Sequence, residues 1–387
     1  MTGLFLVVLV VVLLAAAVSA RWLLWDLRTV PRGGGHPDKA AHVAVVIPAR
    51  DEETTVPALL ESLRRLTVGV AEIVVVDDGS RDATASVARS AGATVLSASA
   101  PPPGWTGKAW ACHLGASATS ADLLLFLDAD TVLARDALGG LLELHERHGG
   151  LVSVQPYHGV VRAYEQLSSY FNVMSLLASA AFARRPGKRP MAFGPCLLTS
   201  RADYERAGGH EAVRAEILDD VQLAAAYDRV GLPVRCAVGG PSIRMRSYPG
   251  GVRQMADGWT KNFASGASAT APGPALASAL WMSAHHGVAV GAALALIEAV
   301  TGRGASLTYG EPALWAVAWV GVAWQLRSIL SRIGSFRWWT WALFPVTLLA
   351  FDVLFARSAA LTVVRRSVPW RGREVDLSRR GSPEEVV

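Results

Sequence analysis

Short apolar runs alternate with amphipathic, Ala/Leu-rich stretches through the middle of the chain, between about His42 and Val238. Runs rich in β-branched residues predict strands, and the amphipathic stretches predict helices. We expect strands over 43–47, 72–76, 94–96 and 123–127, and helices over 55–66, 83–91, 108–118 and 136–148. Strands that are apolar throughout and alternate with helices indicate an α/β domain whose mostly parallel sheet is covered on both faces.

Longer apolar segments lie at both ends of the chain, in keeping with a hydrophobic fraction of 51% and a mean hydropathy of +0.31. Residues 4–20 are nearly all Val, Leu and Ala, and positive charge follows them instead of preceding them. That order favours an uncleaved anchor over a signal peptide. Segments 276–300, 313–330 and 338–364 each approach the ~20 residues that a membrane-spanning helix needs.

Many arginines flank these apolar segments and are not gathered on one domain. The net charge of +5 therefore argues against a nucleic-acid partner and fits the positive-inside rule, with the middle domain in the cytoplasm. Three full spans after that domain would put the basic tail outside, against the same rule. Two solutions stay open: residues 338–364 fold back around Pro345, or one segment lies on the membrane surface.

The expected organisation is that of a multi-pass cell-membrane protein. The boundaries are an anchor over 1–27, a linker over 28–41, an α/β domain over 42–263, a linker over 264–275, membrane segments over 276–364 and a basic tail over 365–387. The three cysteines have no metal-ligand spacing and cannot all pair, which indicates a reduced compartment.

Acidic clusters occur at three points of the α/β domain. Asp77-Asp78 and Asp128-Ala129-Asp130 each close an apolar run, and Asp219-Asp220 opens a later amphipathic helix. Carboxylates at the carboxyl ends of strands face the crevice where α/β proteins bind ligands. Two of them one residue apart can share a hard cation, which often bridges to substrate phosphates. The pattern predicts an enzyme that handles a nucleoside diphosphate.

Each acidic motif also has a plain structural explanation. The acidic residues 51–53, after the first strand, could only complement the dipole of a helix, and Asp219 could only cap one. In the functional interpretation, Asp77 or Asp78 accepts a hydrogen bond from a uracil imide or a ribose hydroxyl. One of the pair Asp219-Asp220 is then a general base for an acceptor hydroxyl.

Four further residues have open roles. Lys108 begins a helix after a Pro/Gly-rich segment and could face a diphosphate, although it could also be a solvated surface lysine. His210 lies in a Gly-Gly-His turn that could be structural only. Trp259 and Lys261 precede an apolar segment, where they could close over a site or anchor the membrane.

Taken in order, these motifs resemble family 2 glycosyltransferases with the GT-A (Rossmann-like) fold, over about residues 43–262. In particular they are similar to the membrane-bound subgroup that acts on carotenoid, hopanoid or other lipid acceptors. The resemblance implies an inverting transfer from a nucleotide-sugar donor, of which a UDP-sugar is favoured. It also implies a divalent metal, Mg²⁺ or Mn²⁺, and a lipid-like acceptor that offers a hydroxyl or a carboxyl.

The resemblance also implies roles for individual residues. The nucleotide-sugar pocket would be formed by Pro48, Arg50, Glu52, Asp77, Asp78, Lys108 and Asp128. The metal would be held by Asp130, with Asp128 nearer the sugar or ribose as a second carboxylate. The acceptor side would include Gly194, His210, Trp259 and Lys261.

The acidic pair of the family is most often Glu-Asp, and its second member is the base. Here the pair is Asp219-Asp220, which puts the base on Asp220. The Gln-x-x-Arg-Trp motif of processive synthases is absent, since Gln254 is followed by Met255-Ala256-Asp257. Transfer of a single sugar is therefore expected.

Two other classes of protein compete with this interpretation. Asp128-Ala129-Asp130-Thr131 also resembles the nucleophile motif of haloacid-dehalogenase-type phosphatases, although those enzymes usually carry it on the first strand. A non-catalytic lipid-binding membrane protein is the other alternative, and its signature would be the absence of nucleotide-sugar binding.

Overall fold

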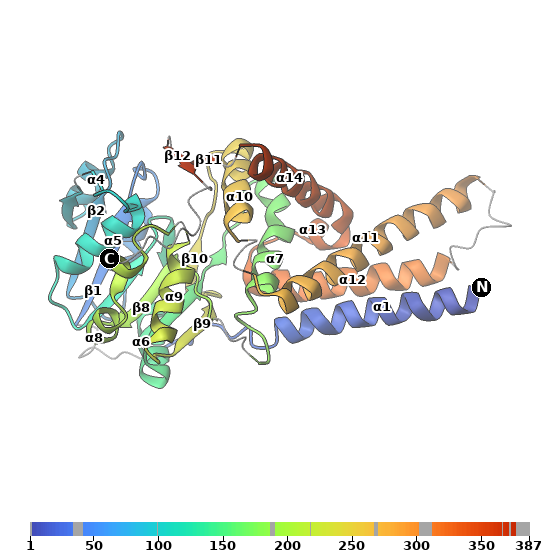
Figure 1. Cartoon of the computed structure of the whole chain (residues 1–387), viewed down its shortest axis with the longest axis horizontal. Helices are drawn as coiled ribbons and strands as arrows, with labels where there is room; N and C mark the ends of the chain where they lie inside the picture. Colours follow the sequence, from blue (N-terminus) through green and yellow to red (C-terminus); the bar gives the residue numbers. More distant parts are fainter. Residues whose placement is uncertain are drawn as a thin grey trace, which may run out of the picture.

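The computed structural model describes residues 2–33, 42–98, 100–185, 190–216, 218–266, 270–301, 312–365, 367–370 and 373–376. The molecule is elongated, with an α/β domain at one end and a group of long helices at the other (Figure 1). The first helix, α1 (Thr2–Leu23), begins at the far end of this group and ends beside the domain.

A seven-stranded sheet forms the centre of the domain, in the order β3-β2-β1-β4-β8-β6-β9. The first four strands are parallel to one another, β8 is antiparallel to both of its neighbours, and β9 is parallel to β6. The strands are β1 (Val43–Ala49), β2 (Glu72–Asp77), β3 (Thr94–Ser97), β4 (Leu123–Leu127), β6 (Leu151–Gln155), β8 (Cys196–Ser200) and β9 (Val234–Val238). The predicted α/β class with a mostly parallel sheet is confirmed.

Side chains of the central strands point alternately to two cores. On β1, Val43, Val45 and Ile47 lie in a cluster with residues of α3 and α6, whereas Ala44 and Val46 lie in a cluster with residues of α5 and α9. Both faces are buried, which explains why the strands are apolar throughout. The domain helices are α3 (Val56–Arg64), α4 (Thr84–Ser90), α5 (Gly107–Ser117), α6 (Ala137–His148), α8 (Arg201–Arg206) and α9 (Asp219–Arg229).

A small second sheet and several short elements connect the domain to the helical part. The sheet contains β5 (Thr131–Leu133), β10 (Ile243–Met245) and β7 (Tyr157–His158). The connecting elements are η1 (Tyr164–Ser168), α7 (Ser169–Ser179) and α10 (Val252–Gly266), whereas η2 (Gly209–Val213) packs within the domain against α5 and α9. A hairpin of β11 (Ser367–Trp370) and β12 (Arg373–Asp376) follows the last helix.

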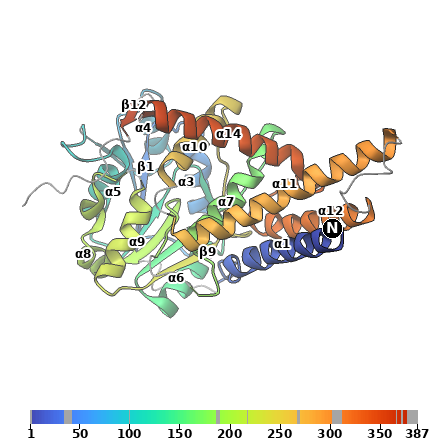
Figure 2. The ribbon, with the colours of Figure 1, turned by 45° about the vertical axis from the view of Figure 1, so that its right-hand side comes forward.

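Within the described residues, three helices are long and apolar enough to cross a membrane. They are α11 (Pro272–Thr301), α12 (Pro312–Ile333) and residues Phe344–Leu361 of α14 (Phe344–Arg365). Helix α1 adds a shorter apolar stretch, Val7–Leu23. Helices α1, α11 and α12 extend away from the domain, and both views show them close together (Figures 1 and 2).

The last apolar segment is broken in two, and its second part returns to the domain. The short helix α13 (Trp338–Ala342) ends at Leu343, and α14 begins directly afterwards, two residues earlier than the turn expected at Pro345. Helix α14 then packs along α7, η1 and α10 (Figure 2). Arg357 forms an ion pair with Asp257 of α10 at 2.7 Å, and the Ser358 hydroxyl donates to the Thr260 carbonyl at 2.9 Å.

A chain of side-chain contacts joins α7 to the long helices. The Tyr170 hydroxyl of α7 lies 2.8 Å from Nδ1 of His285 on α11, and the His285 ring packs on Trp281 at 4.0 Å. Trp281 donates to Gln325 of α12 at 2.9 Å, and Gln325 donates to the Ala17 carbonyl of α1 at 3.0 Å. Four helices are thereby connected through side chains that are largely buried.

Candidate active site

The strand order brings the predicted site residues to one edge of the sheet. Because β2, β1 and β4 are adjacent and parallel, their carboxyl ends meet at the same edge. Pro48 lies near the end of β1, Asp77 ends β2, and Asp128 follows β4 directly. Residues that are up to 80 positions apart in the chain, such as Pro48 and Asp128, therefore become neighbours at this edge.

The loops after β1 and β2 are bound to each other. Arg50 Nη1 donates to the Asp78 carbonyl at 3.2 Å and lies 3.5 Å from its carboxylate. Asp77 accepts the backbone N–H of Ser80 at 3.2 Å. Both aspartates are only 9% exposed. This part of the edge presents an arginine and two carboxylates on a fixed loop pair, as hydrogen bonding to a nucleoside would require.

Glu52 contributes to the same loop pair. Its backbone N–H donates to the Thr84 hydroxyl at 2.8 Å, and its carboxylate accepts from the Thr55 hydroxyl at 2.5 Å. Asp82 accepts the N–H of Thr84 at 3.0 Å at the beginning of α4.

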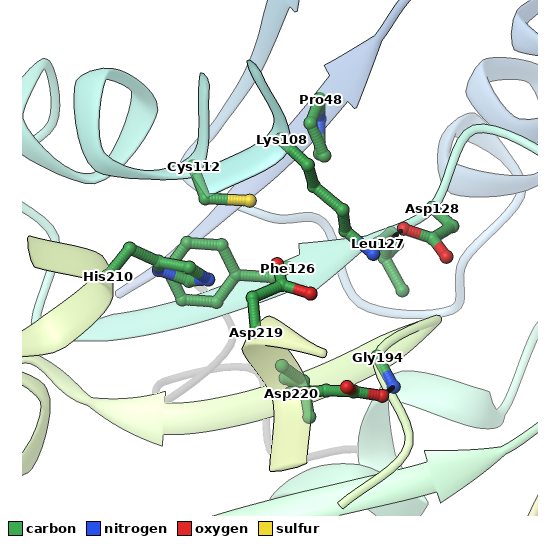
Figure 3. Close-up of a pocket in the computed structure, with 11 residues that line it drawn as sticks. Pro48, Lys108, Cys112, Phe126, Leu127, Asp128, Gly194, His210, Asp219 and Asp220 are labelled. Carbon is green, nitrogen blue, oxygen red and sulfur yellow. Dashed lines mark hydrogen bonds and ion pairs between the residues drawn. The ribbon is translucent and has the colours of Figure 1, made fainter. Parts of the chain in front are cut away.

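A pocket opens beside these loops, between β4, α5, η2 and α9 (Figure 3). Lys108 of α5 enters it from one side and forms an ion pair with Asp128 at 2.8 Å. Desolvation opposes the charge of this lysine, but the carboxylates of Asp128 and Asp219 outweigh it and raise the pKa of Lys108 well above its usual value. The side chain is 40% exposed, so solvent screens part of this attraction.

Asp220 lies on the opposite side of the pocket with both of its oxygens bound by backbone N–H groups. Oδ2 accepts from Gly194 at 2.8 Å, and Oδ1 accepts from Val221 at 2.9 Å. Burial, and next the nearby charge of Asp219, raise the pKa of Asp220 to about 6. A carboxylate with a pKa close to the working pH is suited to general-base chemistry.

Gly194 lies close to two side chains of the pocket. A Cβ at this position would lie 3.2 Å from Lys108 Nζ and 3.3 Å from Asp220 Oδ2. Any side chain here would push against the cation and the carboxylate on the two sides of the pocket. The turn that precedes β8 is therefore part of the pocket wall.

The structure brings some of the predicted residues together and not others. The pocket is lined by Pro48, Lys108, Asp128, Gly194, His210, Asp219 and Asp220. Asp78 and Asp130 lie at the same sheet edge, at the end of β2 and in the turn between β4 and β5, but outside the lining of this pocket. The pocket and the loops that carry Asp78 and Asp130 thus share one edge of the sheet.

Trp259 does not join the pocket. Trp259 is 6% exposed and stacks on Phe171 of α7 at 4.9 Å, inside the cluster formed with the long helices. The burial of α10 against α7 and α14 accounts for this position. The side chain of Lys261 lies outside the described residues.

The sequence interpretation missed four residues that line the pocket. Phe126 and Leu127 end β4, Leu197 belongs to β8, and Cys112 lies one helical turn after Lys108. The spacing of Lys108 and Cys112 puts both on one face of α5, a signal that could have been used. The other three are ordinary core residues whose position at the pocket depends on strand pairing.

Comparisons with known proteins agree with this geometry. Residues 44–208 match the family described as Glycosyl transferase family 2. The chain is 33% identical over 345 residues to a 4,4'-diaponeurosporenoate glycosyltransferase of Staphylococcus aureus, covering 87% of this chain and 89% of the relative. It is 39% identical over 247 residues to the protein of the same name from Staphylococcus haemolyticus, covering 62% of this chain and 66% of that relative.

The fold is also that of a solved glycosyltransferase. A mannosyltransferase of Pyrobaculum calidifontis, in complex with GDP-Man and Mn²⁺, superposes with a TM-score of 0.50 at 20% identity, over 94% of this chain and 99% of the other. The α/β domain thus has the GT-A architecture. Together with the match over most of the chain to the staphylococcal relatives, this shows that the protein belongs to the family 2 glycosyltransferases.

Proposed function

We propose that the protein transfers one sugar from a nucleotide-diphosphate sugar to an oxygen of a lipid-like acceptor, with inversion at the anomeric carbon. The observation that carries this proposal is Asp220, a half-buried carboxylate held by the Gly194 N–H, with a pKa near 6, in the pocket that Lys108 and Asp128 also line.

Asp220 acts as the base of the reaction. It takes the proton of an acceptor hydroxyl as the hydroxyl oxygen bonds to the anomeric carbon and the bond to the diphosphate breaks. Attack from the face opposite the leaving group inverts the configuration. The two backbone N–H groups fix the carboxylate for this contact.

The loops after β1 and β2 hold the nucleoside, through Arg50, Glu52, Asp77 and Asp78. A uracil imide or a ribose hydroxyl offers hydrogens to these carboxylates, so a UDP-sugar is the favoured donor. Lys108 enters the pocket opposite Asp220, with its charge held by Asp128, and it compensates negative charge that develops on the departing diphosphate.

A divalent cation fits the carboxylates after β4. Asp128 and Asp130 are hard oxygen donors one residue apart, the type of ligand that Mg²⁺ and Mn²⁺ prefer. No group of three His, Cys, Asp or Glu side chains surrounds one point within the described part of the chain, so diphosphate oxygens and water would complete the coordination. When bound, the metal supplies charge that neutralises the leaving diphosphate.

The acceptor is a carotenoid-like acid or alcohol. The staphylococcal relatives are named for 4,4'-diaponeurosporenoate, a name that denotes a carboxylate. An acceptor carboxylate reaches the site already ionised and has no proton for Asp220 to remove. The effect of Asp220→Asn should therefore be large with a hydroxyl acceptor and small with a carboxylate acceptor.

The protein is a multi-pass membrane protein with the catalytic domain in the cytoplasm. Helices α1, α11 and α12 are the spans, and α14 remains on the domain side because Arg357 and Ser358 bind α10. Three crossings put the basic tail on the same side as the domain, which satisfies the positive-inside rule. The exposed apolar side chains of α14, such as Leu349 and Val353, then contact the cytoplasmic leaflet.

The test uses the full-length protein in detergent with UDP- and GDP-hexoses, a carotenoid acid, a carotenoid alcohol and Mg²⁺ or Mn²⁺. Mass spectrometry should detect the acceptor with one added hexose and no longer chain. Asp130→Asn should lower transfer by about 100-fold or more, and chelation should abolish it. Asp122→Asn is a matched control, because its side chain is 77% exposed.

With a hydroxyl acceptor, Asp220→Asn should lower kcat by about 10²- to 10⁴-fold. If Asp220→Asn kept wild-type transfer to the alcohol while Asp130→Asn lost it, the base would be assigned wrongly. Hydrolysis of simple phosphate monoesters, unaffected by nucleotide, would revive the phosphatase interpretation, which the family assignment otherwise removes.

A further inference from the structure

His210 lines the pocket, but the proposed reaction does not use it. It lies in η2 and is only 2% exposed. Its ring packs on Phe126 at 4.8 Å and extends toward Phe126 and Asp219 in the pocket (Figure 3). A histidine that is buried at the wall of a polar pocket has a defined hydrogen-bonding capacity, which its neighbours determine.

Tyr204 of α8 determines which ring nitrogen of His210 carries the hydrogen. The Tyr204 hydroxyl oxygen accepts the backbone N–H of His210 at 3.0 Å and lies 2.9 Å from its Nδ1. The phenol has one hydrogen. If Nδ1 also donated to this oxygen, the phenol hydrogen would have no acceptor within the part of the chain that the structure describes, which is costly for a buried group.

The network therefore assigns the phenol hydrogen to Nδ1, and Nε2 of the neutral ring carries its own hydrogen. Burial, with a smaller contribution from the positive charge of Lys108, lowers the pKa of His210 to about 3, so the ring stays neutral at physiological pH. Among the described residues, we find no hydrogen-bond acceptor for Nε2.

We propose that the Nε2–H of His210 donates a hydrogen bond to one hydroxyl oxygen of the transferred sugar, and that Tyr204 is the residue that positions it. The inference rests on the proposed nucleotide-sugar donor and adds a determinant of which sugar is accepted.

The character of the pocket favours the sugar over the apolar part of the acceptor. Lys108, Asp128, Asp219 and Asp220 line the same space as His210. An apolar chain would remove water from these charges without replacing its hydrogen bonds. A hexosyl group has hydroxyls that donate to the carboxylates and accept from Lys108 and from His210.

A buried N–H that is left without an acceptor penalises the wrong substrate. A site built to bond a substrate hydroxyl rejects the analogue without it far more strongly than an apolar pocket rejects a missing methylene. His210 should therefore discriminate strongly at one position of the sugar ring and have little effect at the others.

The experiment combines enzyme variants with modified donors. The best nucleotide-hexose for the wild type is identified first, and kcat/KM is then measured for each of its monodeoxy forms. For one ring position, removal of the hydroxyl should cost the wild type about 100-fold or more. In His210→Phe, removal of that same hydroxyl should lower kcat/KM by less than about threefold. Removal of a hydroxyl at any other ring position should lower kcat/KM by the same factor as in the wild type.

Two further variants keep the test valid if His210→Phe folds poorly. His210→Gln places an amide N–H near Nε2 and should restore part of the discrimination. Tyr204→Phe removes the partner of Nδ1 and should reduce the discrimination at the same ring position only. His148→Phe, at the end of α6, is a matched control that should behave as the wild type.

Two failures can be told apart. The wild type could transfer sugar and yet lose the same factor in kcat/KM as His210→Phe and Tyr204→Phe on removal of each sugar hydroxyl. In that case His210 is structural only and the inference is wrong. If the wild type transfers sugar from no nucleotide-hexose, the proposed function itself fails, and the inference falls with it.

Discussion

The backbone N–H of Gly194 donates to the Asp220 carboxylate over 2.8 Å, so a glycine in the turn before β8 fixes the orientation of the candidate base. A Cβ there would lie within 3.2–3.4 Å of Lys108 Nζ and two Asp220 atoms. We expect Gly194→Ala to lower kcat by about tenfold, since displacements of a fraction of an ångström already weaken positioned groups. Unchanged kcat in steady-state assays would show that the orientation of Asp220 is not set by this turn.

The activity should depend on pH through Asp220. Its pKa is raised to about 6, first by burial and next by Asp219, and the base must be ionised. With a hydroxyl acceptor, kcat/KM should fall about tenfold per pH unit below 6 and level off above it.

Asp219→Asn provides the matched test of this profile. The substitution removes the neighbouring negative charge, so the pKa of Asp220 falls and the acid limb moves to lower pH. If the acid limb of kcat/KM lay at the same pH in Asp219→Asn and in the wild type, a group other than Asp220 would control the rate.

Lys108 should affect both the binding of the donor and the acid limb of the pH profile of kcat/KM. Lys108→Met removes the cation from Asp128, which we expect to raise the KM for the donor by about tenfold or more. Because Lys108 also lowers the pKa of Asp220, the limb should move to higher pH. Arg64→Met is the control, since that side chain is 69% exposed on α3. Equal KM values in the two variants would assign Lys108 to the surface.

The side of the membrane on which the C-terminal tail lies shows whether α14 crosses the bilayer. If only α1, α11 and α12 cross, the tail lies on the same side as the domain; if α14 crosses as well, it lies on the other side. A fluorescent protein fused after Val387 should fluoresce, and alkaline phosphatase fused at the same position should be inactive, because α14 stays beside α10. The same reporters fused after Thr301, at the end of α11, should give the reverse result. Phosphatase activity at the C-terminus would mean that α14 spans the bilayer despite its contacts with α10.

The elements with strong periodicity were predictable. The four expected strands and four expected helices all occur, with ends that differ by a few residues at most; the strand expected over 43–47, for example, extends to Ala49. Their apolar patterns reflect burial on both sheet faces, which local sequence encodes. The ion pair of Lys108 with Asp128 was not predictable, because it depends on how α5 packs beside β4.

Contacts between distant segments account for what the sequence did not reveal. The antiparallel insertion of β8 between β4 and β6 depends on pairing with strands more than 40 residues away. Trp259 reads as an interfacial residue, yet it is buried because α7 and α14 cover α10. The hydrogen bond of Tyr204 with His210 spans only six residues, but no residue pattern announces it.

The polar chain from Tyr170 through His285, Trp281 and Gln325 to α1 has a mechanical consequence. An enzyme tethered by a flexible stalk could swing toward acceptors at any depth. In the proposed membrane arrangement, these contacts hold the catalytic domain at a fixed height above the bilayer. The rule that follows is that a substrate is accepted only if its reactive group reaches that height. A long rigid molecule with its reactive group at the tip meets that rule, whereas one with the group at mid-length does not.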